Sequence, residues 1–265
     1  MKKIILFLLL SLLIPSTWQD INSSVPTPMN AELISSDINN TKIKFTMDGF
    51  HLIEIDDKNL NNYIVKTENG ASIMEFGYPD LQKFSKSIII PDNSKMSVNI
   101  ISYKYHDYEN VNIAPSKGNL TRDINPDDVP LVYSDFYGED NFFPSSISEL
   151  GNPYILRDLR GQALSFNPFQ YNPVTKILRV YSEIIVEASP NGYSEHNSIT
   201  RVSDTVTLSS NYDEIYKSHF INYNNDNRFN YLVDQGNMLI ISNPAFINYM
   251  QPLVNWKNKK GYQQN

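Results

Sequence analysis

The pattern of apolar and polar residues along most of the chain is that of short, half-buried β-strands. In Lys42–Met47 the two kinds of residue alternate with period two, and Phe50–Ile55 repeats the pattern after the turn pair Asp48-Gly49. Strands at this spacing, with turn signals between them, predict an antiparallel β-sandwich. Further strands of this kind are expected at Tyr63–Lys66, Ser87–Ile90, Met96–Tyr105 and Val111–Ala114.

The clearest predicted hairpin lies between residues 161 and 188. Gly161–Tyr171 is expected to form one arm, Asn172–Thr175 the turn and Ile177–Ala188 the other arm. Both faces of the second arm carry apolar residues, which is typical of an inner strand covered on two sides. The pattern also predicts one short helix in this region, at Asp213–Phe220.

The pattern changes after the polar linker Asn222–Asn227. Met238–Ile241 is a compact apolar run, as in buried parallel strands, and Asn243-Pro244 is a helix start that apolar residues follow at helical spacing. A strand followed by a helix is half of an α/β unit and cannot cover its own apolar faces. We therefore expect residues 229–265 to begin a truncated α/β domain, so that the chain is the front of a longer protein or a truncated copy of one.

The N-terminus has the three parts of a secretory signal peptide. Two lysines are followed by the apolar run Ile4–Ile14, which Pro15 ends. About eleven residues are too few to span a bilayer core of ~30 Å as a helix, so residues 1–19 are expected to be an export signal. An uncleaved anchor is the alternative. The polar residues 20–40 are expected to form a flexible leader.

Composition and charge narrow the classes of function. Lys and Arg total 22 against 29 Asp and Glu, and the net charge of −7 argues against a nucleic-acid binder. Cysteine is absent, which excludes a disulfide framework, a Cys-based zinc site and a cysteine nucleophile within this chain. The sequence contains no calcium-loop spacing, HExxH motif, glycine-rich phosphate loop or Ser-His-Asp spacing, so neither a metal nor a cofactor is expected.

Five stretches, matched in order and spacing along about residues 40–228, carry a resemblance to a known family. They are Ile113–Gly118, Asn125–Pro130, Ile155–Gln162, Gln170–Lys176 and Asp213–Ser218. Together they resemble the N-terminal propeptide of the gingipain family, the secreted caspase-like cysteine peptidases of clan CD. The resemblance implies that residues 41–228 are a β-sandwich prodomain that keeps the peptidase inactive until it is cut off.

The same resemblance implies what the chain lacks. Residues 236–261 are similar to the opening β-α unit of the peptidase domain, and the catalytic His and Cys of that family lie farther downstream. None of the four histidines of this chain matches a catalytic position. The resemblance thus implies that these residues are not an enzyme. Their partner would be a gingipain-like catalytic domain, in cis or in trans, and the mature protein would be secreted and free of the membrane.

Two arginines are candidate functional residues. In Arg-specific members of the family, an Arg at the position of Arg122 enters the S1 pocket of the enzyme, where a guanidinium pairs with a buried carboxylate. A solvated loop arginine is the alternative. Arg228 and Phe229 lie in the exposed linker, where proteolysis concentrates. The family cuts after a basic residue at this boundary, which predicts cleavage between Arg228 and Phe229.

A third candidate is the group Arg157, Asp158 and Arg160. Strand alternation places Asp158 and Arg160 on one side, and we expect a structural ion-pair cluster that orders the strand before the hairpin. Contact with the peptidase domain is the alternative. For the whole chain, the alternative to a prodomain is a secreted β-sandwich that serves as a binding or structural module, or a decayed gene fragment with no inhibitory role.

Overall fold

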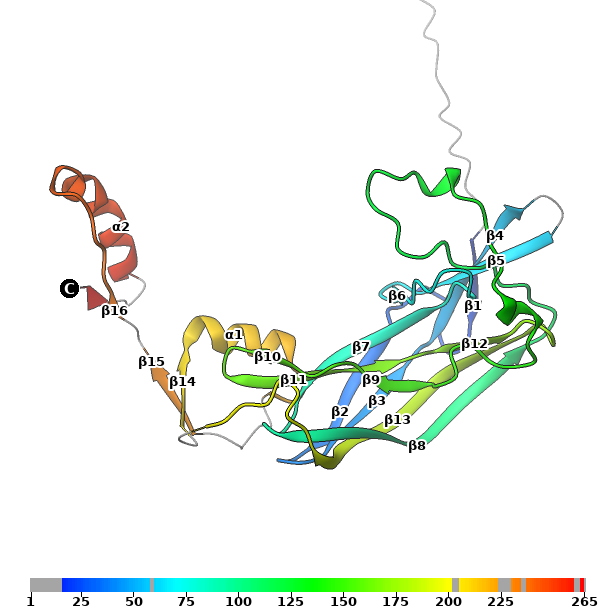
Figure 1. Ribbon diagram of the computed structural model, residues 1–265, viewed down its shortest axis with the longest axis horizontal. Helices are drawn as coiled ribbons and strands as arrows, with labels where there is room; N and C mark the ends of the chain where they lie inside the picture. Colours follow the sequence, from blue (N-terminus) through cyan, green and yellow to red (C-terminus); the bar gives the residue numbers. More distant parts are fainter. Residues whose placement is uncertain are drawn as a thin grey trace, which may run out of the picture.

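The structure is a computed structural model that describes residues 16–57, 60–201, 205–223, 230–234, 237–259 and 263–264. Most of its strands are antiparallel, and they form three sheets that make up the body of the molecule (Figure 1). The predicted fold class, a mainly antiparallel β protein, is confirmed. The apolar run Ile4–Ile14 of the predicted signal peptide lies outside the described residues.

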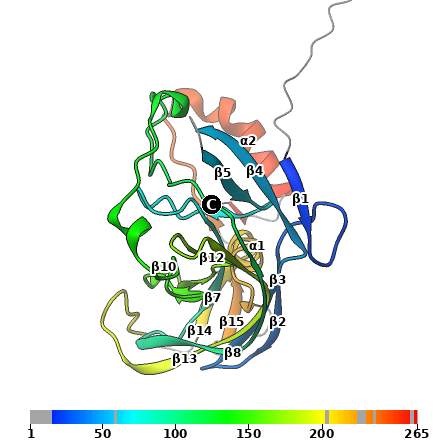
Figure 2. The ribbon, with the colours of Figure 1, turned by 90° about the vertical axis from the view of Figure 1, so that its right-hand side faces the viewer.

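The first sheet has the order β12-β13-β3-β2, and β8 pairs with the other edge of β13. Figure 2 shows this sheet curving around β7, which belongs to the second sheet. The strands of the first sheet are β2 (Asn30–Ser36), β3 (Thr41–Thr46), β8 (Ser94–Tyr108), β12 (Phe169–Asn172) and β13 (Ile177–Tyr193).

The second sheet has the order β10-β11-β7-β6, and β9 also pairs with β11. Its strands are β6 (Ala71–Ser72), β7 (Gln82–Ile89), β9 (Ser148–Leu150), β10 (Tyr154–Leu156) and β11 (Leu159–Phe166). A third sheet has the order β1-β4-β5. It consists of β1 (Ser16–Asp20), β4 (Gly49–Asp57) and β5 (Leu60–Lys66).

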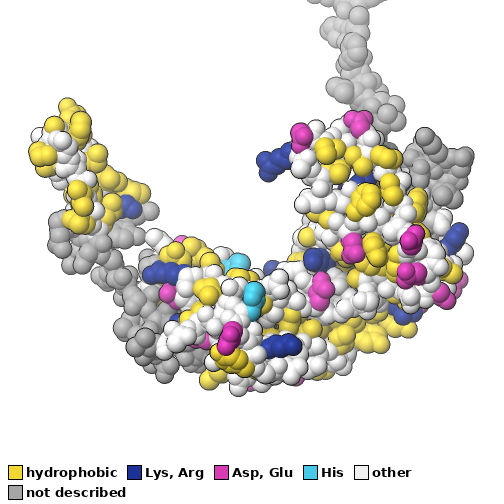
Figure 3. All heavy atoms as spheres, in the orientation of Figure 1, with side chains coloured by type: hydrophobic (Ala, Val, Ile, Leu, Met, Phe, Trp, Pro, Cys, Tyr) yellow, Lys and Arg dark blue, Asp and Glu magenta, His cyan; other side chains and the backbone are white. Residues whose placement is uncertain are grey.

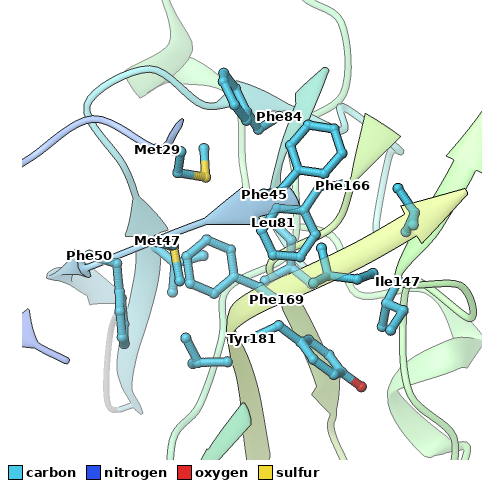
Figure 4. Close-up of a cluster of buried hydrophobic side chains, with 14 of the residues drawn as sticks. Met29, Phe45, Met47, Phe50, Leu81, Phe84, Ile147, Phe166, Phe169 and Tyr181 are labelled. Carbon is cyan, nitrogen blue, oxygen red and sulfur yellow. The ribbon is translucent and has the colours of Figure 1, made fainter. Parts of the chain in front are cut away.

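The main hydrophobic core lies between the first two sheets. Phe45 of β3 stacks on Phe166 of β11 with a centroid separation of 5.7 Å, so the two sheets are in direct contact (Figure 4). Phe45, Phe50, Phe166 and Phe169 are all fully buried. Because full burial of one such side chain contributes about 1.5–3 kcal/mol, this aromatic layer is a principal source of the stability of the sandwich.

The strand β13 has one buried face and one half-exposed face. Its alternate apolar residues face the core, as the period-two pattern predicts. The other face carries Glu183, whose carboxylate lies 2.9 Å from Lys44 and 3.0 Å from Lys104 on the neighbouring strands. These lysines lower the pKa of Glu183. The expectation that β13 is covered on both faces is therefore wrong, because ion pairs between neighbouring strands occupy its outer face.

The predicted hairpin at residues 161–188 is confirmed only in its second half. The strands β12 and β13 pair around a turn in which the Asn172 side chain accepts the backbone N–H groups of Val174 and Thr175. Residues 161–166, by contrast, belong to β11 of the second sheet. Pro168 interrupts the expected single arm because it has no N–H to donate to a ladder, and the chain changes sheets at this point.

Two other predictions about the N-terminal half are wrong. Residues 20–40 do not form a flexible leader throughout, because Asn30–Ser36 is β2 and pairs with β3. This edge strand tolerates polar residues because its outward side chains remain in solvent. The turn pair Asp48-Gly49 lies between β3 and β4, which belong to different sheets. The second wrong prediction is the strand Val111–Ala114, which is largely buried but makes only an isolated bridge, between Ile113 and Tyr63.

A helix and several short strands follow the sandwich. The predicted helix at Asp213–Phe220 is confirmed as α1 (Ser210–His219). The parallel strands β14 (Thr205–Ser209) and β15 (Asn230–Asp234) pair beside it. Figure 1 shows this region, together with α2, extending from one end of the sandwich.

The C-terminal prediction is confirmed for the helix and wrong for the strand. The Asn243 side chain accepts the backbone N–H of Ala245, after which α2 (Ile247–Lys259) begins. In the predicted strand, only Met238 is extended, in β16 (Asn237–Met238), which pairs with β17 (Gln263–Gln264). Ile241 is 87% exposed, and no described side chain of α2 is buried.

A second, smaller core attaches α1 to the sandwich. It contains Leu159 of β11 and Ile89 of β7, packed against Tyr216 and Phe220 from α1 and the residue that follows it. Tyr154 of β10 stacks on Phe220. This core joins the segment before the linker to the end of the second sheet.

Gly161 leaves the space in which this second core packs. A Cβ at Gly161 would lie 2.5 Å from a ring carbon of Phe220 and 2.8 Å from Tyr154. We expect Gly161→Ala to destabilise the protein by about 1–3 kcal/mol in urea unfolding, because both rings must move. Gly151→Ala is the matched control, since its Cβ would meet Ala163 at an ordinary 3.6 Å. Equal stabilities for the two variants would contradict the close packing of this core.

Candidate functional site

A long loop between Ser116 and Ser134 is the candidate functional site. Both of its ends are tied to one residue: Gly77 N–H donates to the carbonyl of Ser116, and Ser134 N–H donates to the carbonyl of Gly77, each at 3.0 Å. Gly77 has a φ of +79°, which favours glycine. The loop is therefore closed at its base, and it rises beside β4 and β5 (Figure 1).

The sequence-predicted residue Arg122 lies at the tip of this loop. The N–H of Ile124 donates to the carbonyl of Thr121 at 3.1 Å, which places Arg122 and Asp123 at the two central positions of a tight turn. Both residues are exposed. The hydrogen bond from the Thr121 side chain lowers the pKa of Asp123, which favours its ionised form.

Two further contacts brace the loop behind the turn. Lys117 Nζ donates to the carbonyl of Pro126 at 2.7 Å and so ties the two stems of the loop together. The Asn125 side chain accepts the N–H of Asp127 at 3.3 Å and caps a short 3-10 helix. The arginine is thus presented to solvent on a turn whose backbone is held by its neighbours.

Asp80 lies at the base of this loop, where its backbone N–H donates to the carbonyl of Ala114. Burial raises the pKa of its carboxyl, against a smaller opposing effect of Lys66. Because the pKa of Asp80 is higher in the folded protein than in the unfolded chain, protonation of Asp80 stabilises the fold at low pH. This stabilisation is lost as the pH rises from the ordinary value near 4 through the raised pKa.

We therefore expect Asp80→Asn to be more stable than the parent at pH 7, because the amide carries no charge to desolvate. The advantage should shrink as the pH falls through the raised pKa of Asp80 toward about 4, and it should be absent below that value, where Asp80 is protonated in both the folded and the unfolded state. Urea unfolding at several pH values measures this difference. The exposed Glu109→Gln serves as the control, and an Asp80→Asn advantage that is independent of pH would contradict the proposed cause.

The candidate cluster Arg157, Asp158 and Arg160 is brought together only in part. Arg157 and Asp158 form the two-residue turn between β10 and β11, with Arg157 Nε 3.2 Å from the Asp158 carboxylate. Arg157 adopts a left-handed φ of +51°, and its guanidinium lies 4.1 Å from the ring centroid of Tyr212. Asp158 also accepts the hydroxyl of Tyr216. These contacts bind the turn to α1.

Arg160 does not belong to this ion-pair cluster, and that part of the prediction is corrected. Its side chain is 1% exposed, and the guanidinium donates to four backbone carbonyls at 2.7–2.9 Å. Burial lowers its pKa. The turn at Arg157-Asp158 places Arg160 inside, where its guanidinium donates to backbone carbonyls and not to the carboxylate of Asp158. The four acceptors are Pro91, Ser94, His196 and Asn197.

Sequence reasoning missed a pair that completes this region. Arg201 donates to both carboxylate oxygens of Asp92, at 2.5 and 3.1 Å, and to the carbonyl of Asp158. The two partners are 109 residues apart, so no local spacing could have revealed them. Arg160 and Arg201 together fasten the segment around residues 196–201 to the sandwich.

The remaining predictions about sites have these outcomes. The predicted cleavage position, Arg228 and Phe229, lies outside the described residues. Within the described ranges, no group of three or more His, Cys, Asp or Glu side chains is placed to hold a metal ion. None of the described helices is both long enough and apolar enough to cross a membrane.

Comparison with known proteins assigns this fold and loop to the class of peptidase propeptides. Residues 24–227 match the family model Propeptide_C25. The chain belongs to this family, which confirms the resemblance to the gingipain propeptide.

Curated relatives come from Porphyromonas gingivalis. Gingipain R2 is 36% identical over 231 residues, covering 86% of this chain and 31% of the relative. Gingipain R1 is 34% identical over 223 residues, covering 83% of this chain and 22% of the relative. A Lys-gingipain is 26% identical over 201 residues. The chain therefore spans about a third or less of the length of the curated relatives it matches.

Two solved structures share the fold. One is the complex of Porphyromonas gingivalis RgpB pro- and mature domains, with a TM-score of 0.67 and 37% identity, covering 73% of this chain and 97% of that chain. The other concerns the zymogenic latency of gingipain K from the same organism, with a TM-score of 0.56 at 20% identity, and shows the fold alone. A gingipain propeptide of this fold thus occurs in complex with its mature domain.

Proposed function

We propose that residues 41–228 are the inhibitory and folding-assisting propeptide of a secreted, gingipain-like cysteine endopeptidase. The propeptide occludes the active site of that enzyme until it is cut off. The observation that carries this proposal is Arg122 itself, which is exposed at the tip of a loop tied at its base and braced along its stems. The chain has no cysteine, so it contributes no nucleophile of this class.

The chemistry of Arg122 suits an arginine-selective pocket. A guanidinium offers a planar set of donors that pairs with a buried carboxylate through two parallel hydrogen bonds. In this proposal Arg122 enters the S1 pocket like a substrate side chain, and the surrounding loop covers the cleft. Because the turn is held by its own hydrogen bonds, little conformational entropy is lost when the arginine binds.

The C-terminal region supports a partner in cis. No described residue of α2 is buried, so its apolar side chains would be covered only by contact with another domain. Figure 1 shows α2 and the Arg122 loop at opposite ends of the sandwich and on the same side, and Figure 3 shows this side hollowed between them. In this proposal, a peptidase domain that continues from residues 229–265 occupies the hollow between α2 and the Arg122 loop. Tethering gives an effective concentration of about millimolar for a short linker.

In the same proposal, cleavage of the linker releases the propeptide from the peptidase. Cleavage between Arg228 and Phe229 removes the covalent tether, so the propeptide dissociates at the rate its intrinsic affinity allows. Export through the signal peptide at residues 1–19 places the precursor outside the cell. The expected mature partner is then a secreted or cell-surface peptidase.

The test is a titration of the purified chain against the mature peptidase Gingipain R2 during hydrolysis of an arginine substrate. We expect saturable loss of activity, with an unrelated cysteine peptidase unaffected. If the chain inhibits neither this enzyme nor a Lys-gingipain, the proposal fails. That result would favour the alternative of a β-sandwich module or gene fragment without inhibitory role.

A further inference from the structure

We propose that an apolar surface beside the Arg122 loop is a second, separate contact with the peptidase domain. This surface, which we call the apolar shelf, consists of Met74, Phe76, Val132 and Tyr133. Their side chains are 51%, 56%, 43% and 40% exposed. The inference rests on the proposed function, because it assigns to the same partner a surface that the arginine alone does not explain.

The shelf residues come from two segments that touch each other. Met74 and Phe76 lie in the connection between β6 and β7, and Val132 and Tyr133 precede the end of the Arg122 loop. A Cβ on Gly77 would lie 3.3 Å from the carbonyl oxygen of Val132, so the two segments are in van der Waals contact. Figure 3 shows hydrophobic side chains gathered on the lobe that carries β4, β5 and this loop.

The shelf is also joined to the other stem of the loop. A Cβ on Gly118 would lie 3.2 Å from the Cβ of Phe76, so Phe76 packs directly against this stem. The contact between Lys117 and Pro126 then connects that stem to the segment behind Arg122. Ile124, which is 42% exposed, follows Arg122 by two residues and therefore lies within about 7 Å of it along the chain. Ile124 thus adds an exposed apolar side chain next to the arginine, and the shelf lies at the base of the same loop.

These side chains are held in place by their neighbours. The ring of Tyr133 meets Tyr137 edge-on at 4.7 Å, and its hydroxyl accepts the Asn62 side-chain amide at 2.8 Å. Met74 adopts a left-handed φ of +60° while its side chain stays exposed. A strained backbone that displays an apolar side chain costs free energy, and such strain collects at binding sites. The shelf is therefore preorganised for contact.

The peptidase domain is the occupant because the shelf lies at the base of the loop that carries the proposed S1 contact. A partner that receives Arg122 must extend past Ile124, and the surface it meets next along the lobe is this shelf. Exposed apolar patches of a few hundred Å² mark protein interaction sites in soluble proteins. The matching surface of the peptidase should be apolar and lie at the rim of its substrate cleft.

The experiment compares inhibition constants of the full chain and its variants against mature Gingipain R2. We expect the double variant Met74→Ser, Phe76→Ser to inhibit at least tenfold more weakly than the parent. Val132→Lys tests the shelf independently from the other segment, and it should weaken inhibition in the same direction. Because all three side chains are largely exposed, the melting temperatures should stay close to that of the parent.

A matched control comes from the edge strand β8. Ile100 and Ile101 are 43% and 53% exposed, and the variant Ile100→Ser, Ile101→Ser should inhibit as the parent does. Combined with Arg122→Ala, the shelf variant should add its own loss, because in this proposal Arg122 and the shelf contact different parts of the peptidase.

The outcomes separate the two proposals. Inhibition by the parent with unchanged constants for both shelf variants would overturn the shelf and leave the proposed function standing. A parent that does not inhibit at all overturns both. If the shelf instead joins two copies of this chain, sedimentation will show a dimer that the shelf variants abolish while inhibition is unchanged, and that result also overturns the assignment to the peptidase.

Discussion

Replacing Arg122 with alanine is expected to weaken inhibition of an Arg-specific gingipain by roughly 30-fold to several thousand-fold. The variant leaves the carboxylate of the S1 pocket buried without its partner, which costs about 2–5 kcal/mol. At 1.4 kcal/mol for each factor of ten, this cost gives the stated range. The measurement is the inhibition constant of the purified chain, with parent and variant titrated side by side.

Two further variants make this prediction specific. Arg122→Lys retains the positive charge but not the two parallel hydrogen bonds, so its inhibition constant should lie between those of the parent and the alanine variant. Lys95→Ala removes an exposed cation on β8, away from the loop, and should change nothing. Because Arg122 is exposed, its loss should leave the free energy of unfolding within about 0.5 kcal/mol of the parent. Equal inhibition by parent and Arg122→Ala would remove Arg122 from the interface.

Replacing Arg160 with methionine is expected to lower the free energy of unfolding by about 3–5 kcal/mol, the largest effect on stability that we predict. The variant keeps much of the buried volume but removes the donors of four hydrogen bonds. Each buried carbonyl left without a donor costs about 1–3 kcal/mol, partly relieved where water enters. Urea unfolding of parent and variant measures the difference.

The same region provides the control. Arg157 has a side chain that is 37% exposed and an ion pair with Asp158, so Arg157→Ala should cost no more than about 1 kcal/mol. Arg160→Lys should remain strongly destabilised, because a lysine has three donors for the four carbonyls. Hydrogen exchange should also show early opening of residues 196–201 in the methionine variant. A loss below 1 kcal/mol for Arg160→Met would show that these carbonyls do not depend on the guanidinium.

Local features of the sequence predicted the elements whose causes are local. The alternation in Lys42–Met47 gave β3 its buried face, and Asn172 gave the β12–β13 turn its side-chain acceptor. Asn243-Pro244 began a helix where the capping pattern placed it. In each case the interaction joins residues a few positions apart, so the pattern and the structure report the same physical contact.

Which sheet a strand joins was decided by contacts that periodicity does not contain. Residues 161–171 alternate like one strand, yet they form β11 and β12 in different sheets, because Pro168 cannot donate to the ladder. Asn30–Ser36 is polar enough to suggest a leader, but backbone pairing with β3 makes it an edge strand. Met238–Ile241 is apolar enough for a buried strand, but Ile241 has no described neighbour that covers it and remains 87% exposed.

The candidate site likewise has some features that the sequence predicted and others that only the tertiary structure shows. The family resemblance singled out Arg122 by its position along the chain, and the absence of cysteine excluded a nucleophile of that class from the sequence itself. Only the tertiary structure ties both ends of the loop to Gly77, and only it gathers the shelf beside the loop. The tertiary structure also shows that Arg160, which was expected to form an ion pair, donates hydrogen bonds to four backbone carbonyls. The reason is that these partners are far apart in the chain, and folding alone brings them together.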